Sequence, residues 1–156
     1  MEGFDNEKAK RVWQRVQGTA SVPQDVGYDI RELVAKETEA AATYLQLSRR
    51  LQGKDSTTVR QMAEDERSHA AVLKGICAMN TGTRPEVSAT VPQTGPVEVL
   101  LRRCYGGELQ SVAEYERRSG DPQYGMVFRK MAEEEKSHCR HLLELLGRLE
   151  QKPKRV

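Results

Sequence analysis

Residues 60–69 read RQMAEDERSH, and residues 129–138 read RKMAEEEKSH. The two decapeptides agree at seven of ten positions, at an offset of 69 residues, and each ends in Glu-x-x-His. Because similar segments recur in the same order in both halves of the chain, we predict that one structural unit is repeated. Upstream of each decapeptide a glutamate precedes a tyrosine by seven residues, as Glu37 with Tyr44 and Glu108 with Tyr115.

The repeated unit is predicted to be a helical hairpin. Apolar residues recur at helical spacing around both decapeptides, and breaker residues interrupt this pattern at positions 53–55 and 120–122. A stretch rich in Gly, Pro, Thr and Ser, residues 80–96, separates the halves. The expected fold is all-α: a four-helix bundle of two hairpins, residues 28–79 and 97–151, joined by this long crossover.

The two ends of the chain are predicted to lie outside the bundle. Residues 1–27 form an extension in which residues 8–17, around Trp13, have the pattern of a short amphipathic helix. We expect this helix to pack on the bundle, and the alternative is a helix that docks on a membrane surface or a partner. Residues 152–156 are expected to form a solvated tail.

The composition excludes several classes of protein. The 156 residues are 37% hydrophobic and 31% charged, and no apolar run approaches the ~18 residues of a membrane-spanning helix. The N-terminus lacks the apolar segment of a secretory signal, so we expect a cytoplasmic location. A net charge of +2 with interleaved signs argues against a nucleic-acid partner. Three cysteines without a CxxC pair are expected to be free thiols.

Helical spacing places one carboxylate from each predicted helix on the stripe that faces the core. Positions i, i+3, i+4 and i+7 share a helix face, so each Glu-x-x-His motif also directs its histidine inward. Four carboxylates and two imidazoles are therefore predicted to meet. These residues are Glu37 on the first helix, Glu66 and His69 on the second, Glu108 on the third, and Glu135 and His138 on the fourth.

Six such side chains in a core predict a metal site with two ions. Unpaired buried carboxylates are strongly destabilising and would also repel one another, whereas two divalent cations neutralise four of them. One Glu from each of two helices and Glu-x-x-His from the other two is the arrangement of di-iron and di-manganese bundles. Mixed carboxylate and imidazole ligands suit iron better than structural zinc, with manganese as the alternative.

The remaining acidic residues on these helices are interpreted as solvated. They lie on faces next to the inward stripe, where charged side chains normally meet water. The alternative interpretation is that all the glutamates are solvated and the stripes are displaced by one position, which makes both matched histidines coincidental. The neighbours concerned are Glu39, Glu64, Glu114, Glu116, Glu133 and Glu134.

The motif set resembles that of the ferritin-like superfamily: Glu37-x-x-Ala40-x-x-x-Tyr44, Glu66-x-x-His69, Glu108 and Glu135-x-x-His138. Over residues 29–149 it is most similar to the di-iron domain of rubrerythrins, with bacterioferritins second. The resemblance implies that Glu66 and Glu135 bridge the two metals or bind both, and that Glu37 and Glu108 each cap one metal. The two histidines would supply the nitrogen ligands. A homodimer and an external electron donor of the rubredoxin type are also implied.

The chain departs from both families at identifiable positions. Ser111 stands where rubrerythrins typically carry a further glutamate, one turn after the ligand of the third helix. No rubredoxin domain with CxxC pairs is attached, so electrons would come from another protein. Arg67 stands where bacterioferritins place a haem-ligating methionine, and only a few residues follow Leu149 in place of their fifth helix. We therefore expect no haem.

The function predicted is a rubrerythrin-like, non-haem di-iron oxidoreductase that reduces hydrogen peroxide or oxygen. Tyr44 and Tyr115 lie two turns from the capping glutamates, where a phenol can hydrogen-bond a ligand carboxylate across the core, and they are the candidate catalytic residues. The alternative is that both are ordinary core aromatics. A ferroxidase or iron-storage protein, and a metal-free helical interaction module, are the competing functions.

The third histidine and the cysteines are given structural roles. His141 lies one turn beyond His138 and is interpreted as a surface or satisfied side chain, with a supporting base or spare ligand as the alternative. Cys104 is expected to be a small buried apolar residue, and Cys77 and Cys139 are interpreted in the same way.

Overall fold

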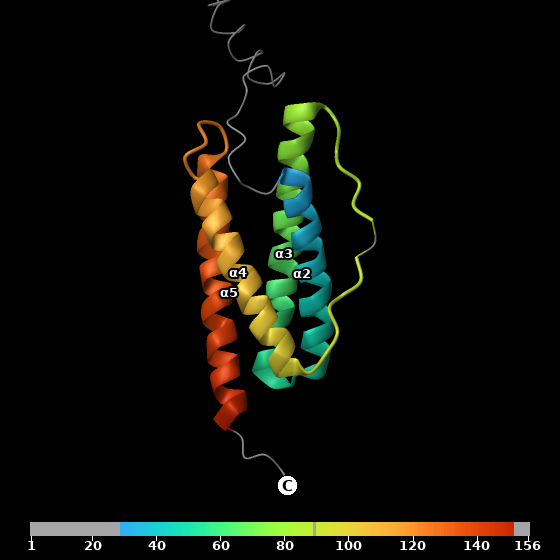
Figure 1. The fold of residues 1–156 in the computed structure, drawn as a ribbon, viewed down its shortest axis with the longest axis vertical. Helices are drawn as coiled ribbons and strands as arrows, with labels where there is room; N and C mark the ends of the chain where they lie inside the picture. Colours follow the sequence, from blue (N-terminus) through green and yellow to red (C-terminus); the bar gives the residue numbers. More distant parts are fainter. Residues whose placement is uncertain (1–28, 89, 152–156) are drawn as a thin grey trace, which may run out of the picture.

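The computed structural model describes residues 29–88 and 90–151. These residues contain helices and connecting segments but no strand. The all-α class and the helical bundle are confirmed, whereas the helix predicted in residues 8–17 lies outside the described residues. In chain order the helices are α2 (Ile30–Arg50), α3 (Gly53–Thr81), α4 (Val97–Arg118) and α5 (Gly125–Gln151) (Figure 1).

Local hydrogen bonds account for where two of these helices end and begin. At the end of α3, Gly82 has a φ of 74°, which glycine adopts without strain, and its N–H donates to the Ala78 carbonyl at 2.8 Å. Before α5, the Asp121 carboxylate accepts from the backbone N–H groups of Gln123 and Tyr124 at 2.8 and 2.7 Å. These contacts satisfy backbone groups that a helix end leaves unpaired.

Two boundaries differ from the sequence prediction. Residues 53–55, expected as the break after the first helix, form the first turn of α3, and the break consists of Leu51 and Gln52. Leu51 is extended, and an aspartate in the first turn of α3 interacts favourably with the helix dipole. At the other end, α3 continues to Thr81, whose hydroxyl donates to the carbonyl of the preceding turn at 2.8 Å.

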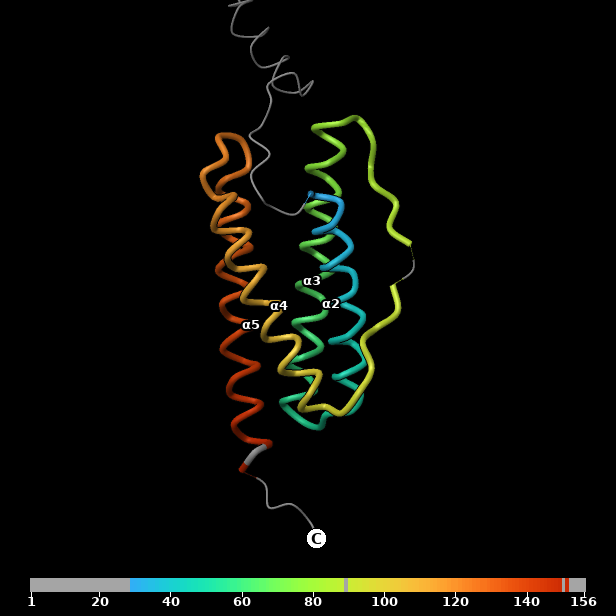
Figure 2. The backbone as a smooth tube through the Cα atoms, in the orientation of Figure 1, coloured from blue at the N-terminus to red at the C-terminus, as the bar shows by residue number. Residues whose placement is uncertain are grey.

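The helices pair as two antiparallel hairpins, α2 with α3 and α4 with α5, which lie against each other (Figures 1 and 2). A long crossover returns the chain along the α2–α3 hairpin to the end where α4 begins. Gln93 fixes the crossover to α2, because its backbone N–H donates to the Thr43 hydroxyl at 3.2 Å and its side chain donates to Glu39 at 2.8 Å. Arg50 also donates to the Gly95 carbonyl at 2.7 Å.

The core consists of two apolar clusters with a polar layer between them. On α3, Met62 belongs to one cluster and Leu73 to the other, while Glu66 and His69 lie between them along the helix. The first cluster contains Tyr44, Leu47, Val59, Met62, Ala63, Leu100, Leu101, Leu142 and Leu145. The second contains Leu33, Val34, Leu73, Ile76, Tyr115, Phe128, Met131 and Ala132.

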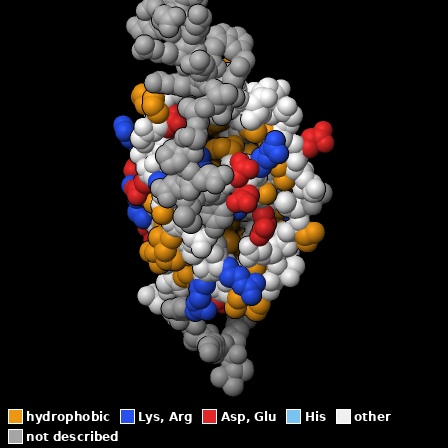
Figure 3. Space-filling view, turned by 45° about the horizontal axis from the view of Figure 1, so that its top comes forward, with side chains coloured by type: hydrophobic (Ala, Val, Ile, Leu, Met, Phe, Trp, Pro, Cys, Tyr) orange, Lys and Arg blue, Asp and Glu red, His pale blue; other side chains and the backbone are white. Residues whose placement is uncertain are grey.

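The described residues contain no membrane-spanning helix, and the face drawn in Figure 3 carries charges of both signs. Within the described residues, no helix combines the length and apolarity needed to cross a bilayer. Acidic and basic side chains are interspersed on the described part of the face drawn in Figure 3. The mixed surface agrees with the interleaved charges of the sequence.

Gly125 is required by a close backbone approach at the start of α5. A Cβ atom there would lie 2.4 Å from the Ser119 carbonyl oxygen, whereas one at Gly147 would meet nothing within 4 Å. We therefore expect Gly125→Ala to lower the free energy of unfolding by about 1–3 kcal/mol. Gly147→Ala should raise it by about 1 kcal/mol. Urea denaturation measures both changes, and equal effects of the two substitutions would contradict this packing.

Candidate metal centre

The polar layer brings together the six side chains that the sequence placed on the core stripes. All six have 4% or less of their surface exposed, and they form two overlapping groups. Within each group, one candidate ligand atom per residue can be chosen such that all lie within 4.8 Å of one another. The groups are Glu37, Glu66, His69 and Glu135, and Glu66, Glu108, Glu135 and His138.

The two Glu-x-x-His motifs interlock across the α3–α5 interface. His69 Nδ1 lies 3.2 Å from Glu66 Oε2 on its own helix and 3.0 Å from Glu135 Oε1 on α5. His138 Nδ1 lies 3.0 Å from Glu135 Oε2 and 3.0 Å from Glu66 Oε1 on α3. Each histidine therefore directs its Nδ1 atom at both motif carboxylates, and the two glutamates are shared by both groups.

The glutamates of α2 and α4 complete the cluster from its other side. Glu37 Oε2 lies 4.0 Å from His69 Nδ1, and Glu108 Oε1 lies 3.5 Å from His138 Nδ1. Each of these two glutamates belongs to only one of the two groups. The arrangement of the donors thus repeats in the two halves of the bundle, as the sequence repeat predicts.

Two buried tyrosines hold these outer glutamates. Tyr44 on α2 donates its hydroxyl hydrogen to Glu108 Oε1 on α4, and Tyr115 on α4 donates to Glu37 Oε1 on α2. The hydrogen bonds therefore cross between the hairpins, at the positions that the seven-residue Glu–Tyr spacing predicted. Tyr115 also stacks on Phe128, with ring centroids 6.1 Å apart.

The sequence interpretation missed two further carboxylates. His69 Nε2 lies 2.7 Å from Glu134 Oε2, and His138 Nε2 lies 3.0 Å from Asp65 Oδ2. Glu134 was interpreted as a solvated residue, but it is half-buried and its carboxylate contacts a buried histidine of the opposite hairpin. The sequence did contain a pattern that could have indicated these two carboxylates, because an acidic residue immediately precedes the motif glutamate in both decapeptides. Such partners orient an imidazole by fixing which nitrogen carries the proton.

Glu114 is a second correction among the acidic neighbours. Its carboxylate, predicted to be solvated, is buried and pairs with Arg117 at 2.7 Å and with Arg118 at 2.6 Å. Burial raises the pKa of Glu114, but the two guanidinium groups outweigh burial and hold it below its usual value. Glu114 belongs to neither of the two groups, and its ion pairs with Arg117 and Arg118 lie within α4.

Burial and mutual repulsion perturb the ionisation of the cluster. Burial, followed by the charges of Glu37 and Glu108, raises the pKa of Glu66 well above its usual value. Burial likewise raises the pKa of Glu108 to about 7. Burial alone would lower the pKa of His69, but the adjacent carboxylates of Glu135 and Glu66 favour the protonated imidazole and raise its pKa to about 11. Without another cation, the cluster therefore retains protons at neutral pH.

Two carboxylate oxygens at the centre have no hydrogen bond. Glu66 Oε1 and Glu135 Oε1 are fully buried, and although each lies 3.0 Å from a histidine Nδ1, neither contact has hydrogen-bond geometry. A buried oxygen without a hydrogen bond is destabilising. Both oxygens belong to the glutamates that the two groups share.

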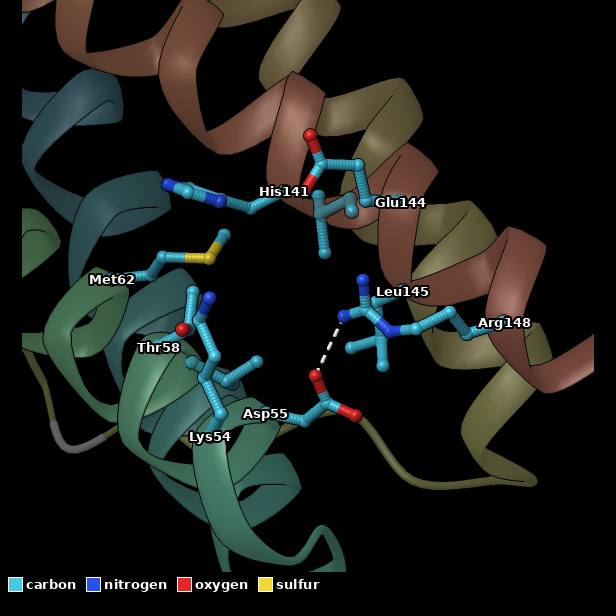
Figure 4. Close-up of a pocket in the computed structure, with 10 residues that line it drawn as sticks. Lys54, Asp55, Thr58, Met62, His141, Glu144, Leu145 and Arg148 are labelled. Atoms are coloured by element: carbon cyan, nitrogen blue, oxygen red, sulfur yellow. Dashed lines mark hydrogen bonds and ion pairs between the residues drawn. The ribbon is translucent and has the colours of Figure 1, made fainter.

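His141 and the cysteines lie apart from the two groups. His141 is exposed and lines a cavity of about 340 Å³ between α3 and α5, with Met62 and the Asp55–Arg148 ion pair (Figure 4). Cys77 and Cys139 are buried and Cys104 is half-buried, and none forms a disulfide. Burial, with the charge of Glu108 next, raises the pKa of Cys104 to about 12, so its sulfur stays a thiol at neutral pH.

The metal-free protein should lose stability as the pH rises from 5 to 9. The folded-state pKa values of Glu108 (about 7) and His69 (about 11) exceed their unfolded values of 4.5 and 6.5. Each group therefore contributes stability below its unfolded pKa and loses it as the pH approaches its folded pKa, by at most about 1.4 kcal/mol per pH unit. The pKa of Glu135 is lowered, so its contribution to the free energy of unfolding changes only at acidic pH.

Chemical denaturation of chelator-treated protein across this pH range measures the slope. His141→Gln is the control, since this exposed histidine lies outside the cluster and its replacement should leave the slope unchanged. A free energy of unfolding that stays constant or increases between pH 5 and 9 would contradict the electrostatics described above.

The centre therefore consists of four carboxylates and two imidazoles in a buried layer shared by four helices. Its chemistry is compatible with metal binding, because carboxylate oxygens and imidazole nitrogens are common metal ligands. Comparisons of the chain with models of protein families, with curated proteins and with solved structures find no match. The function must accordingly follow from the chemistry of these residues.

Proposed function

We propose that the central cluster binds two divalent metal ions and that the protein is a non-haem, rubrerythrin-like oxidoreductase of the ferritin-like type. Its substrate would be hydrogen peroxide or oxygen, and its electrons would come from an external donor. The observation that carries the proposal is the pair of buried oxygens on Glu66 and Glu135 that have no hydrogen bond, each 3.0 Å from the Nδ1 atom of a histidine. A cation is the partner that such oxygens lack.

The residues present fit a pair of divalent ions in charge and in chemistry. Four carboxylates carry about −4 when ionised, two divalent ions carry about +4, and two neutral imidazoles add ligands without adding charge. Carboxylate and imidazole donors without a thiolate favour iron or manganese over a structural zinc site. We propose iron, with manganese as the alternative.

The overlap of the two groups suggests how the ligands would divide. Glu66 and Glu135 belong to both groups, so they would be shared by two ions. Glu37 and His69 would complete one site, and Glu108 with His138 the other. Asp65 and Glu134 would each accept a hydrogen bond from the outer nitrogen of a histidine, which keeps Nδ1 unprotonated and directed at the centre.

When bound, a pair of iron ions supplies two electrons, one from each ion, which with two protons reduce hydrogen peroxide to two water molecules. The protein's own contribution is positioning. Tyr44 and Tyr115 hold protons on their hydroxyl oxygens, because burial raises both phenol pKa values, and they orient the outer glutamates. The apolar clusters above and below exclude bulk water from the layer.

The partners in this proposal rest on the family resemblance. An electron donor of the rubredoxin type would restore the reduced state after each turnover. The three cysteines of the chain are unpaired, and they contribute no disulfide to this electron transfer. The homodimer and the cytoplasmic location stay predictions.

Metal loading tests the proposed centre directly. After anaerobic loading with ferrous iron and removal of unbound metal, we expect two irons per chain by elemental analysis, and about one equivalent of peroxide should oxidise them. Glu135→Ala should abolish stable binding, since it removes a shared ligand. Its neighbour Glu133 is exposed, so Glu133→Ala should retain two irons.

Other loading results would assign a different function. Far more than two irons per chain after exposure to air would indicate mineral storage. No retained iron, with a parallel failure of manganese loading, would contradict the metal centre and leave the helical interaction module as the better description.

Asp65 and Glu134, which accept hydrogen bonds from the two histidines, should control metal affinity without binding metal themselves. Asp65→Asn removes the charge that accepts the hydrogen bond of His138 Nε2, and losses at such positions typically weaken metal binding about 10- to 100-fold. Competition with a chelator of known affinity measures the change. Glu64→Gln, at the exposed preceding position, is the control, and equal affinities of the two variants would contradict the role of Asp65.

A further inference from the structure

A cavity between α2 and α4 opens onto the candidate metal centre. Its volume is about 480 Å³, and its wall includes both outer glutamates, Glu37 and Glu108, together with Tyr44. A water molecule takes up about 30 Å³ of liquid, so peroxide or oxygen would occupy little of this space. Cavities of about 300–1,000 Å³ are typical of sites for small organic molecules.

The cavity lies on the side of the centre that the histidines leave open. His69 and His138 come from α3 and α5, and their outer nitrogens are covered by Glu134 and Asp65. From α2 and α4 the centre receives only one glutamate each. A ligand in the α2–α4 cavity would therefore meet the outer carboxylates without displacing an imidazole.

Two consecutive glycines in the middle of α4 keep one wall of the cavity free of side chains. Gly106 and Gly107 both line it, although glycine inside a helix is unfavourable by roughly 0.5–1 kcal/mol relative to alanine. Close packing does not require them, because a Cβ at either position would meet nothing within 4 Å. Because both positions line the cavity, we expect a longer side chain there to reduce its volume.

The cationic side chains of the cavity favour an anion once the centre is neutralised. Lys36 and Arg103 line it, and the carboxylate of Glu39 accepts a hydrogen bond from Gln93 of the crossover. If two divalent ions balance the four central carboxylates, the remaining lining carries two positive charges and one negative charge. Guanidinium and ammonium groups are the usual partners of carboxylates in such sites.

We propose that the α2–α4 cavity binds a small organic carboxylate, with its charged end toward Lys36 and Arg103 and its body over Gly106 and Gly107. The charge balance rests on the proposed function, since only a metal-loaded centre cancels the central carboxylates. The size of the cavity and its glycine wall are independent of that occupancy.

Three probes of similar shape test the proposal on the metal-loaded full-length chain: benzoate, benzamide and benzylammonium. Calorimetric titration should show benzoate binding about tenfold or more tightly than either of the others, as a charge-assisted contact predicts. Arg103→Gln should weaken benzoate binding about tenfold. Gly107→Leu should abolish it by filling the cavity, with two metals per chain retained in each variant.

Gly75→Leu is the matched control. Gly75 is also half-buried inside a helix, a Cβ there would meet nothing within 4 Å, and it lines neither of the two cavities described above. It should bind benzoate as the parent protein does. The cavity proposal would be overturned by equal binding of the three probes, by absence of benzoate binding, or by unchanged binding in Gly107→Leu. In each of these cases, two metals per chain would still support the proposed metal centre. A parent protein that retains no metal would overturn the proposed function and this inference together.

Discussion

Four buried carboxylates lie together in the interior of one small bundle, and their mutual repulsion determines what the surrounding residues have to supply. Separated from water, the negative charges of Glu37, Glu66, Glu108 and Glu135 are compatible with folding only if cations or protons accompany them. The elevated pKa values of Glu66 and His69 show how the chain responds with its own groups, by retaining protons. Metal ions would provide the same compensation and would release those protons.

The other features of the core follow from this constraint. Apolar clusters on both sides confine the charges to a single layer, and phenols from α2 and α4 satisfy the outer carboxylates across the bundle. Asp65 and Glu134 extend the network outward to half-exposed positions. The histidines are thus connected to the half-exposed surface through charged partners, while one oxygen on each of the two shared glutamates, Glu66 and Glu135, has no hydrogen bond.

The sequence was sufficient to predict the residues that face the core, but not the carboxylates that hydrogen-bond to the two histidines. Helical period and a repeated decapeptide require only the order of residues, which is why Glu66 and His138 could be placed on core-facing stripes. Asp65 and Glu134 lie one position away, and whether that position meets water or a neighbouring helix depends on the distance between hairpins. The burial of Glu114 was not predicted for a similar reason: its carboxylate pairs with two arginines one turn later on the same helix.

The near-repetition of the two hairpins has a consequence for assembly of the centre. Each hairpin carries one outer glutamate, one Glu-x-x-His motif and one tyrosine, which amounts to half of the donor set. The interlocking contacts therefore behave like a complementary interface between two bodies, and the crossover acts as a tether between them. Such a tether turns an encounter between two molecules into an internal one, at an effective concentration on the order of millimolar. Formation of the centre is thereby independent of protein concentration.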